Sequence, residues 1–352
     1  MRNYAALSDY EFELLVGDLL EAELGMRFER FARGRDLGID LRHTNDHGGP
    51  DIVQAKHYQG SAWSDLKRAV EKEAGKLRKL NPQPYSYRLV TSQGLSPQRK
   101  TLIRDLLDPY IARDDHVYGR EDIEQLLDRF PDIERRHIKL WLASATGLKA
   151  LLNAGIHGRS RQLVADITKM LPLWVESHDF LDAERRLAEE HVLMISGPPG
   201  IGKTTLARIL VAAAVQKGYE PVVVNSDINE AWAVHDPTRP QIFLYDDFLG
   251  QTSYVELTKN EDSRLVSFIA EAVRHPNTLF VLTTREYILQ RALQVSEAFR
   301  RHGLASGRFL LALESYSRLD RGRILYNYVW HSRAIPSEGL EQLGLTAATR
   351  EL

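Results

Sequence analysis

Nine consecutive residues in the second half of the chain have the types and the spacing of a loop that binds a polyphosphate. They fit the pattern G-x-x-x-x-G-K-[ST], with an apolar run before them and a helical pattern after them. The glycines let backbone N–H groups surround the phosphates, Lys203 supplies a positive charge, and the hydroxyl of Thr204 can ligate Mg²⁺. The motif therefore predicts binding of a nucleoside triphosphate with Mg²⁺. The predicted loop consists of Gly197, Pro198, Pro199, Gly200, Ile201, Gly202, Lys203, Thr204 and Thr205.

Two later strand patterns end in residues that could act on such a nucleotide. Asp246 and Asp247 follow the apolar run 242–245, at the carboxyl end of a strand, where open α/β sheets bind ligands. Asp246 is the expected partner of Thr204 on Mg²⁺, and Asp247 could polarise the attacking water. Arg285 ends another strand pattern and could offset charge in the transition state, although a surface salt bridge is the alternative for this residue.

A second group of polar residues stands in the N-terminal part of the chain. Asp40 belongs to one strand pattern, and Gln54 and Lys56 belong to the next, after a turn-rich stretch. If the two strands form an antiparallel hairpin, Asp40 lies opposite Gln54, and the period of two puts all three side chains on one face. A carboxylate that holds Mg²⁺, beside a lysine that positions or deprotonates the nucleophile, suits hydrolysis of a phosphodiester. Glu13, on the first predicted helix, could add a second carboxylate.

Basic residues near these positions could form a surface that faces DNA phosphates. Acidic neighbours offset part of their charge, so an ordinary solvated surface is the alternative. Three histidines, His43, His47 and His57, lack the spacing of zinc ligands, so we expect no zinc site. The basic residues are Arg27, Arg30, Arg33, Arg35, Arg42, Lys56, Lys67 and Arg68.

Composition sets limits on the kind of protein this is. A length of 352 residues suggests two domains, and 46 Lys and Arg against 48 Asp and Glu leave the chain almost neutral. With no cysteine, disulfides, thiolate metal sites and cysteine nucleophiles are excluded. The N-terminus lacks the pattern of a secretory signal, and no apolar stretch reaches the ~18 residues that span a bilayer. We therefore expect a soluble, cytoplasmic protein that has no membrane partner.

Local patterns predict an α/β fold in two parts. Ser8 and Glu11 form a capping box for a helix over 8–24 that Gly25 ends. Residues 120–156 read as charged helix, broken at Pro131. Further strands are expected at 26–32, 38–43, 51–58 and 85–91, and further helices at 62–80 and 97–108. In the second half, strand patterns at 191–196, 220–224, 241–245, 278–283 and 308–313 alternate with helices. This alternation predicts a doubly wound parallel sheet.

Four segments of the second half together resemble the STAND class of P-loop NTPases, in the branch found in bacterial antiviral STAND proteins. They are GPPGIGKTTLA, FLYDDFLG, KNEDSRL and LTTREYIL, within about residues 170–333. The resemblance implies ATP and Mg²⁺ as cofactors, with Lys203 and Thr204 on phosphate and metal. It also implies that Asp246 and Asp247 are the acidic pair and that Arg285 is the sensor arginine.

The same resemblance implies a switch in which ATP drives assembly into a homo-oligomer, rather than a motor. Such proteins usually continue into a lid and a long sensor built of repeats, which would respond to a phage-derived trigger. We therefore expect residues 336–352 to be a tail or the start of a lid, in a truncated or short form of such a protein.

The N-terminal constellation resembles the restriction-endonuclease fold, in its Mrr-like branch, over about residues 5–118. In that branch an acidic residue after Gly-Ile or Gly-Val and a Gln-x-Lys motif replace the more general acid-x-Lys pattern. Carried onto this chain, the resemblance implies a nuclease core of Asp40, Gln54 and Lys56, assisted by Glu13, with double-stranded DNA as the substrate. Because an amide binds metal less strongly than a carboxylate, the number of metal ions stays open.

Together these patterns predict a defence effector in four segments: a nuclease domain at 1–118, a helical connector at 119–169, a P-loop NTPase domain at 170–335 and the tail at 336–352. ATP binding is expected to control oligomerisation and Mg²⁺-dependent DNA cleavage. One alternative is a restriction enzyme in which NTP turnover moves or remodels DNA. Another is an ATP-switched DNA-binding module whose nuclease fold is catalytically silent.

Overall fold

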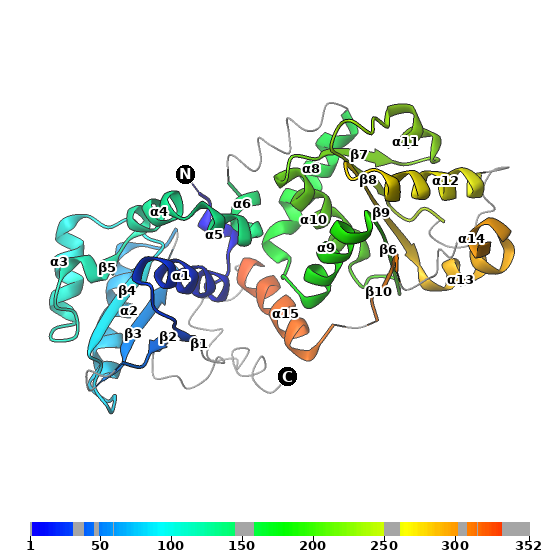
Figure 1. The fold of residues 1–352 in the computed structure, drawn as a ribbon. Helices are drawn as coiled ribbons and strands as arrows, with labels where there is room; N and C mark the ends of the chain where they lie inside the picture. Colours follow the sequence, from blue (N-terminus) through cyan, green and yellow to red (C-terminus); the bar gives the residue numbers. More distant parts are fainter. Residues whose placement is uncertain are drawn as a thin grey trace. The chain divides into compact units, whose positions relative to one another are not determined.

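The computed structural model describes residues 2–30, 39–45, 49–58, 60–144, 158–249, 261–301, 308–314 and 316–332. These residues form two compact units. The first contains residues 2–144 together with 325–332, and the second contains the described residues between 158 and 324. Each unit contains one five-stranded sheet (Figure 1). None of the described helices combines the length and the apolar character that spanning a membrane would require.

The sheet of the first unit is mixed. Its strand order is β1-β2-β3-β4-β5, in which β1 to β3 pair antiparallel and β3 to β5 pair parallel. Sequence patterns predicted every strand of this sheet except β5. The strands are β1 (Glu29–Arg30), β2 (Leu41–His43), β3 (Asp51–Lys56), β4 (Ser86–Thr91) and β5 (Val117–Tyr118).

The β2–β3 hairpin has the register that the sequence predicted. Leu41 lies opposite Val53, so the residue before β2, Asp40, comes level with Gln54. Side chains of a strand alternate between its two faces. Val53 accordingly belongs to one buried apolar cluster, while Ile52 belongs to another on the opposite face of the sheet. Gln54 and Ile52 are two residues apart, and they therefore share a face.

Helices cover both faces of this sheet. The predicted capping box of α1 is confirmed, with Ser8 and Glu11 bonded to each other, and Gly25 ends the helix with a φ of 64°. α1, α4 and α5 pack on the face of Val53, and α2 and α3 pack on the face of Ile52. The helices are α1 (Asp9–Leu24), α2 (Trp63–Leu77), α3 (Pro97–Leu106), α4 (Arg120–Arg129), α5 (Pro131–Arg136) and α6 (Ile138–Leu142), with short 3₁₀ turns at Tyr4–Ala6 and Asp114–His116.

The helices that the sequence assigned to a connector bring apolar side chains to the core of the first unit. The predicted break is found where α4 ends at Arg129 and α5 begins at Pro131. Leu126 and Leu127 of α4 and Ile133 of α5 belong to the same buried cluster as α1. The functional boundaries at 118, 169 and 335 stay predictions.

The second unit has the predicted doubly wound parallel sheet, with strand order β10-β6-β9-β8-β7. Figure 1 shows α8, α9 and α10 on one side of this sheet and α11, α12 and α13 on the other. The strands are β6 (Val192–Gly197), β7 (Glu220–Val224), β8 (Gln241–Tyr245), β9 (Thr278–Arg285) and β10 (Leu310–Ala312). The helices are α8 (Gly158–Met170), α9 (His178–Glu190), α10 (Lys203–Gln216), α11 (Asn229–Val234), α12 (Glu261–Arg274), α13 (Glu286–Val295) and α14 (Glu297–Arg301), with a 3₁₀ turn at Leu171–Leu173.

One helix has residues in both units. α15 (Arg318–Ser332) starts in the second unit, and its residues from Leu325 onward belong to the first. Within the first unit, Tyr326 donates from Oη to Asp9 Oδ1 at 2.6 Å. The ring of Trp330 stacks on His57, with 6.2 Å between the centroids. The last turns of α15 are therefore part of the first unit's structure.

Candidate nucleotide and nuclease sites

The predicted phosphate loop leaves β6 at Gly197 and runs into α10 at Lys203. Gly200 and Gly202 have φ values of 79° and 98°, in the left-handed region that glycine adopts without strain. The tip of the loop is exposed, whereas Lys203 is buried and donates from Nζ to the backbone oxygens of Gly197 at 3.1 Å and Pro198 at 2.9 Å. The loop thus forms an exposed backbone turn around a fixed amine.

The acidic strand end meets this loop through a direct hydrogen bond. Thr204 donates from Oγ1 to Asp246 Oδ1 at 3.0 Å. Thr283, at the end of β9, donates to the same carboxylate oxygen at 2.5 Å and accepts the backbone N–H of Asp247 at 2.8 Å. β9 lies between β6 and β8 in the sheet, so its carboxyl end lies between the loop and the acidic pair. The hydroxyl of Thr204 and the carboxylate of Asp246 are oxygen ligands of the kind that Mg²⁺ prefers.

A second cation stands at the same edge of the sheet. Arg285 ends β9 opposite Gly197, the first residue of the phosphate loop, and its Nη1 lies 3.4 Å from the hydroxyl of Tyr287. Burial lowers the pKa of Lys203; the carboxylate of Asp247 opposes this shift, and the charge of Arg285 adds to it. Arg285 is therefore near enough to act on the charge of Lys203. Two cations beside an exposed backbone turn favour a polyanion such as a triphosphate.

The role of every residue predicted for this site stays a prediction. Pro198, Pro199, Ile201 and Thr205 lie in or next to the loop, and their contact with nucleotide stays a prediction. The segment KNEDSRL begins outside the described residues, and its last five residues open α12.

The three residues predicted for the nuclease core meet near the start of β2. Gln54 is 3% exposed and donates from Nε2 to Asp40 Oδ2, and the backbone N–H of Ala55 donates to the same oxygen at 2.7 Å. Lys56 is two residues further along β3, and its Nζ lies 3.2 Å from Glu73 Oε2, on α2. Burial alone would lower the pKa of Lys56, but the carboxylates of Glu73 and Asp40 outweigh it and raise the pKa overall. Lys56 therefore keeps its proton.

Glu13 lies on a helix that covers the opposite face of the sheet. It belongs to α1, which packs on the face of β3 that carries Val53 and Ala55, whereas Gln54 and Lys56 lie on the α2 face. Its predicted contribution to the nuclease site stays a prediction.

Most of the predicted phosphate-facing cations are paired with acidic side chains. Arg42 is 2.7 Å from Glu29, Lys67 is 3.8 Å from Glu71, and Arg68 is 4.0 Å from Asp65. Arg30 lies between Asp18 at 2.5 Å and Glu21 at 3.6 Å. The alternative of an ordinary solvated surface thus fits these residues. Arg33 and Arg35 lie outside the described residues.

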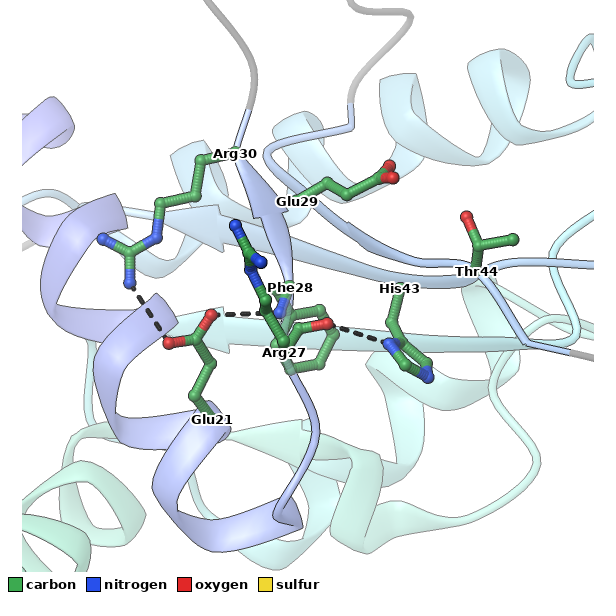
Figure 2. A pocket seen from close by; sticks show the side chains of 7 residues that line it. All are labelled: Glu21, Arg27, Phe28, Glu29, Arg30, His43 and Thr44. Carbon is green, nitrogen blue, oxygen red and sulfur yellow. Dashed lines mark hydrogen bonds and ion pairs between the residues drawn. The ribbon is translucent and has the colours of Figure 1, made fainter.

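A hollow of about 840 Å³ lies where α1 meets the edge strand β1 and its neighbour β2. Figure 2 shows Arg30 directed toward Glu21 at its rim, and His43 bonded through Nδ1 to the backbone oxygen of Arg27. This hollow contains neither Asp40 nor the phosphate loop among its lining residues. It marks a polar surface and not one of the two candidate sites.

Of the three histidines, His57 has contacts with aromatic rings and with a serine hydroxyl. His57 is half-buried between aromatic rings, with Phe12 at 4.9 Å and Trp330 at 6.2 Å between centroids. Its Nδ1 is bonded to Ser92 Oγ at 2.9 Å, and burial lowers its pKa. His47 lies outside the described residues. Across the described part of the chain, no three His, Cys, Asp or Glu side chains are grouped closely enough to hold a metal.

The nuclease core nevertheless has unsatisfied oxygen atoms that fit a divalent cation. Oε1 of Gln54 and Oε1 of Glu73 are buried and have no hydrogen-bond partner among the described residues. Buried acceptors normally have a partner. Carboxylate and amide oxygens are the types of ligand that Mg²⁺ accepts.

Sequence reasoning missed two residues at these sites. Glu73 could have been found, because it is a carboxylate at an otherwise apolar helix position, between Val70 and Leu77. Tyr316 gave no such signal: its hydroxyl would lie 2.6 Å from a Cβ placed on Gly202, so any larger residue at that loop position would clash with it. That contact joins segments far apart in the sequence.

Comparisons with known proteins match both halves of the chain. Residues 174–331 match the family model of Novel STAND NTPase 3, and residues 4–97 match the restriction endonuclease family model Mrr_cat. A protein of Sinorhizobium fredii, "Uncharacterized protein y4cD", is 34% identical over 169 residues, which are 48% of this chain and 26% of that protein.

Shorter stretches of the chain are similar to proteins named Clp1. The "mRNA cleavage and polyadenylation factor clp1" of Botryotinia fuckeliana is 34% identical over 80 residues, 21% of this chain and 17% of that protein. The "Polyribonucleotide 5'-hydroxyl-kinase Clp1" of Bos taurus is 35% identical over 86 residues, 21% of this chain and 20% of that protein. The chain thus spans about a quarter or less of the length of these curated relatives.

Among solved structures, NtrX from Brucella abortus in complex with ADP aligns with 85% of this chain and 70% of its own, at 11% identity and a TM-score of 0.30. The resemblances predicted from the sequence are confirmed by the two family matches. The chain therefore combines an Mrr-type restriction-endonuclease domain with a Novel STAND NTPase 3 domain that follows it in the sequence.

Proposed function

We propose that this protein is an ATP-controlled nuclease of bacterial antiviral defence, which cuts double-stranded DNA when nucleotide binding assembles it. One observation carries the proposal: each domain brings together, by direct hydrogen bonds, the residues that its chemistry needs. Thr204 contacts Asp246 beside the phosphate loop, and Gln54 contacts Asp40 two residues before Lys56.

In the NTPase domain, the backbone of the phosphate loop and Lys203 bind the triphosphate of ATP. Thr204 and Asp246 would hold Mg²⁺, which supplies positive charge to the phosphate oxygens. Asp247 orients the attacking water, and Arg285 offsets the charge that develops on the transferred phosphoryl group. The proximity of Arg285 to Lys203 supports its role as the sensor arginine.

In the nuclease domain, Asp40 and the amide oxygen of Gln54 would hold Mg²⁺, which supplies a more acidic water and charge for the scissile phosphate. The raised pKa of Lys56 favours a cationic role over that of a general base. Lys56 then positions the nucleophile or the phosphate and stabilises negative charge. The unsatisfied oxygen of Gln54 supports an active metal site over a silent fold.

ATP binding is the switch in this proposal. It promotes a homo-oligomer that brings nuclease domains together on duplex DNA, and a phage-derived trigger sets the response in motion. The basis is the STAND family match of residues 174–331.

The test measures assembly and cleavage with the same protein. Mass is determined by light scattering, and plasmid cleavage is followed with Mg²⁺, each without nucleotide, with ATP and with a non-hydrolysable ATP analogue. We expect a larger species and faster cleavage with the analogue. A permanent monomer that translocates on DNA would support the remodelling enzyme instead. DNA binding with no cleavage under any nucleotide condition would support the silent module.

A further inference from the structure

Glu73 is a carboxylate on the buried stripe of α2. The buried positions of this helix are Leu66, Val70, Glu73 and Leu77, and Glu73 is only 1% exposed. Spacings of three and four residues put these side chains on one helix face. Burial of a carboxylate is unfavourable unless the charge is compensated. An acidic residue at this position therefore needs a reason beyond the packing of the stripe.

The contacts of Glu73 use only one of its two oxygens. Nζ of Lys56 lies 3.2 Å from Oε2, and Nζ of Lys76 lies 3.6 Å from the same atom. Oε1 has no hydrogen-bond partner among the described residues, and the same holds for Oε1 of Gln54. One unsatisfied oxygen thus comes from the strand that carries Lys56, and the other comes from the helix that pairs with Lys56.

Asp40 and Glu73 together raise the pKa values of two neighbouring side chains, Lys56 and Tyr87. Burial lowers the pKa of Lys56, and the two carboxylates raise it by more. Burial raises the pKa of Tyr87, and the same two carboxylates raise it further. The hydroxyl of Tyr87 is fully buried and lacks a partner among the described residues. Both carboxylates therefore act on one enclosed polar region.

We propose that Glu73 supplies the second carboxylate of the metal site that Asp40 and Gln54 begin, with its Oε1 as the ligand atom. This inference rests on the proposed nuclease function. A neutral amide at position 54 leaves the hairpin with a single carboxylate, and Glu73 restores a second negative charge for a divalent cation. Lys56 pairs with the other oxygen of Glu73, so Oε1 is left for the metal, although the charge of Lys56 competes with the metal for this carboxylate.

The test titrates the nucleotide-free full chain with Mn²⁺ by calorimetry, in a Thr204→Ala background that removes a ligand from the nucleotide site. We expect Glu73→Gln to weaken Mn²⁺ binding at least tenfold, as Asp40→Asn does. The matched control is Glu71→Gln, on the same helix but exposed and paired with Lys67, which should bind Mn²⁺ like the parent. Equal affinity in the parent and Glu73→Gln would overturn the inference.

A second variant keeps the test decisive if Glu73→Gln fails to fold. Lys56→Met removes the cation that competes for Glu73 at nearly unchanged volume, so Mn²⁺ should bind several-fold more tightly and raise Tm more than it does in the parent. Unchanged or weaker binding in Lys56→Met would mean that Glu73 only neutralises this lysine.

Plasmid cleavage by the parent is measured separately. A protein that binds Mn²⁺ through Glu73 but does not cut DNA would refute the proposed function alone. One that cuts DNA equally well with Glu73→Gln would refute this inference alone.

Discussion

The hydroxyl of Thr283 joins the two acidic residues of the nucleotide site: it donates to Asp246 Oδ1 at 2.5 Å and accepts the backbone N–H of Asp247 at 2.8 Å. Thr283 is fully buried at the end of β9. A single side chain therefore fixes the side chain of one acid and the backbone of the other.

Thr283→Val keeps the shape of the side chain and removes both hydrogen bonds. An unmade buried bond costs about 1–3 kcal/mol, so loss of this orientation should slow ATP hydrolysis roughly 10- to 100-fold. Nucleotide affinity should change little, because the phosphate loop is intact. Phosphate release and fluorescent-nucleotide binding measure the two effects. Thr283→Ser keeps the hydroxyl and should hydrolyse ATP near the parental rate; an unimpaired valine variant would contradict the role.

Lys203→Ala should abolish nucleotide binding, because it removes the amine enclosed by the phosphate loop. The fold should persist, as judged by an unchanged circular dichroism spectrum. Lys217→Ala is the matched control, since Lys217 follows the same helix and pairs on the surface with Glu184 at 2.9 Å. Unchanged ATP affinity in Lys203→Ala would remove the basis for the nucleotide site.

Asp246→Ala and Asp247→Ala should each impair hydrolysis more than binding. Most phosphate contacts come from the loop, while these carboxylates serve the metal and the water, so each loss should raise the barrier by about 3–4 kcal/mol. Single-turnover hydrolysis and equilibrium binding separate the two effects. If both variants hydrolyse ATP at the parental rate, the metal and water roles belong to other residues.

Asp40→Ala and Lys56→Ala should each eliminate Mg²⁺-dependent plasmid cleavage while ATP binding persists, because the two sites belong to different units. Asp132→Ala, an exposed carboxylate on α5, is the control and should cut like the parent. Gln54→Glu is the sharper variant: it restores acid-x-Lys and should keep or raise metal affinity if this side chain faces the ion. Robust cleavage by both alanine variants would exclude this hairpin as the active site.

Acid stability of the first unit should depend on Asp18. Its carboxylate accepts from Arg30 at 2.5 Å and from His137 at 2.9 Å. Burial opposes ionisation, but these bonds lower its pKa from 3.8 to about 2. A depressed folded-state pKa stabilises the protein above the unfolded value and loses this effect as pH falls through the folded one. The contribution is about 2 kcal/mol.

Asp18→Asn should therefore be less stable than the parent above about pH 4, and the difference should shrink toward pH 2. Urea unfolding across this range measures it. A difference that does not vary with pH would assign the effect to packing alone.

Local and short-range features were predictable from the sequence. The capping box of Ser8 and Glu11 depends on residues within one turn, and the register of Asp40 and Gln54 depends on one hairpin. The strand order was not predictable, because the placement of β9 between β6 and β8 is decided by packing of segments distant in sequence. The same is true of β5, which has only two residues and joins the sheet edge at Leu89.

The candidate nuclease site was likewise predictable only in part. Asp40, Gln54 and Lys56 follow from the hairpin, but the partner of Lys56 comes from α2, and alternation in β3 alone does not say which helix covers that face. Glu13 illustrates the converse: its helix was predicted correctly, while the face on which that helix packs was not available from its pattern.

The division of α15 between the units has a consequence for biosynthesis. Asn327 donates to Glu11 at 3.4 Å, and Glu11 also pairs with the buried amine of Lys139 at 2.9 Å. Tyr326, Asn327 and Trp330 are translated only after the whole second unit. Domains generally fold as units during synthesis, N-terminal first, yet here the first unit must await its last helix. The first unit is therefore complete only after the described part of the second unit has been made.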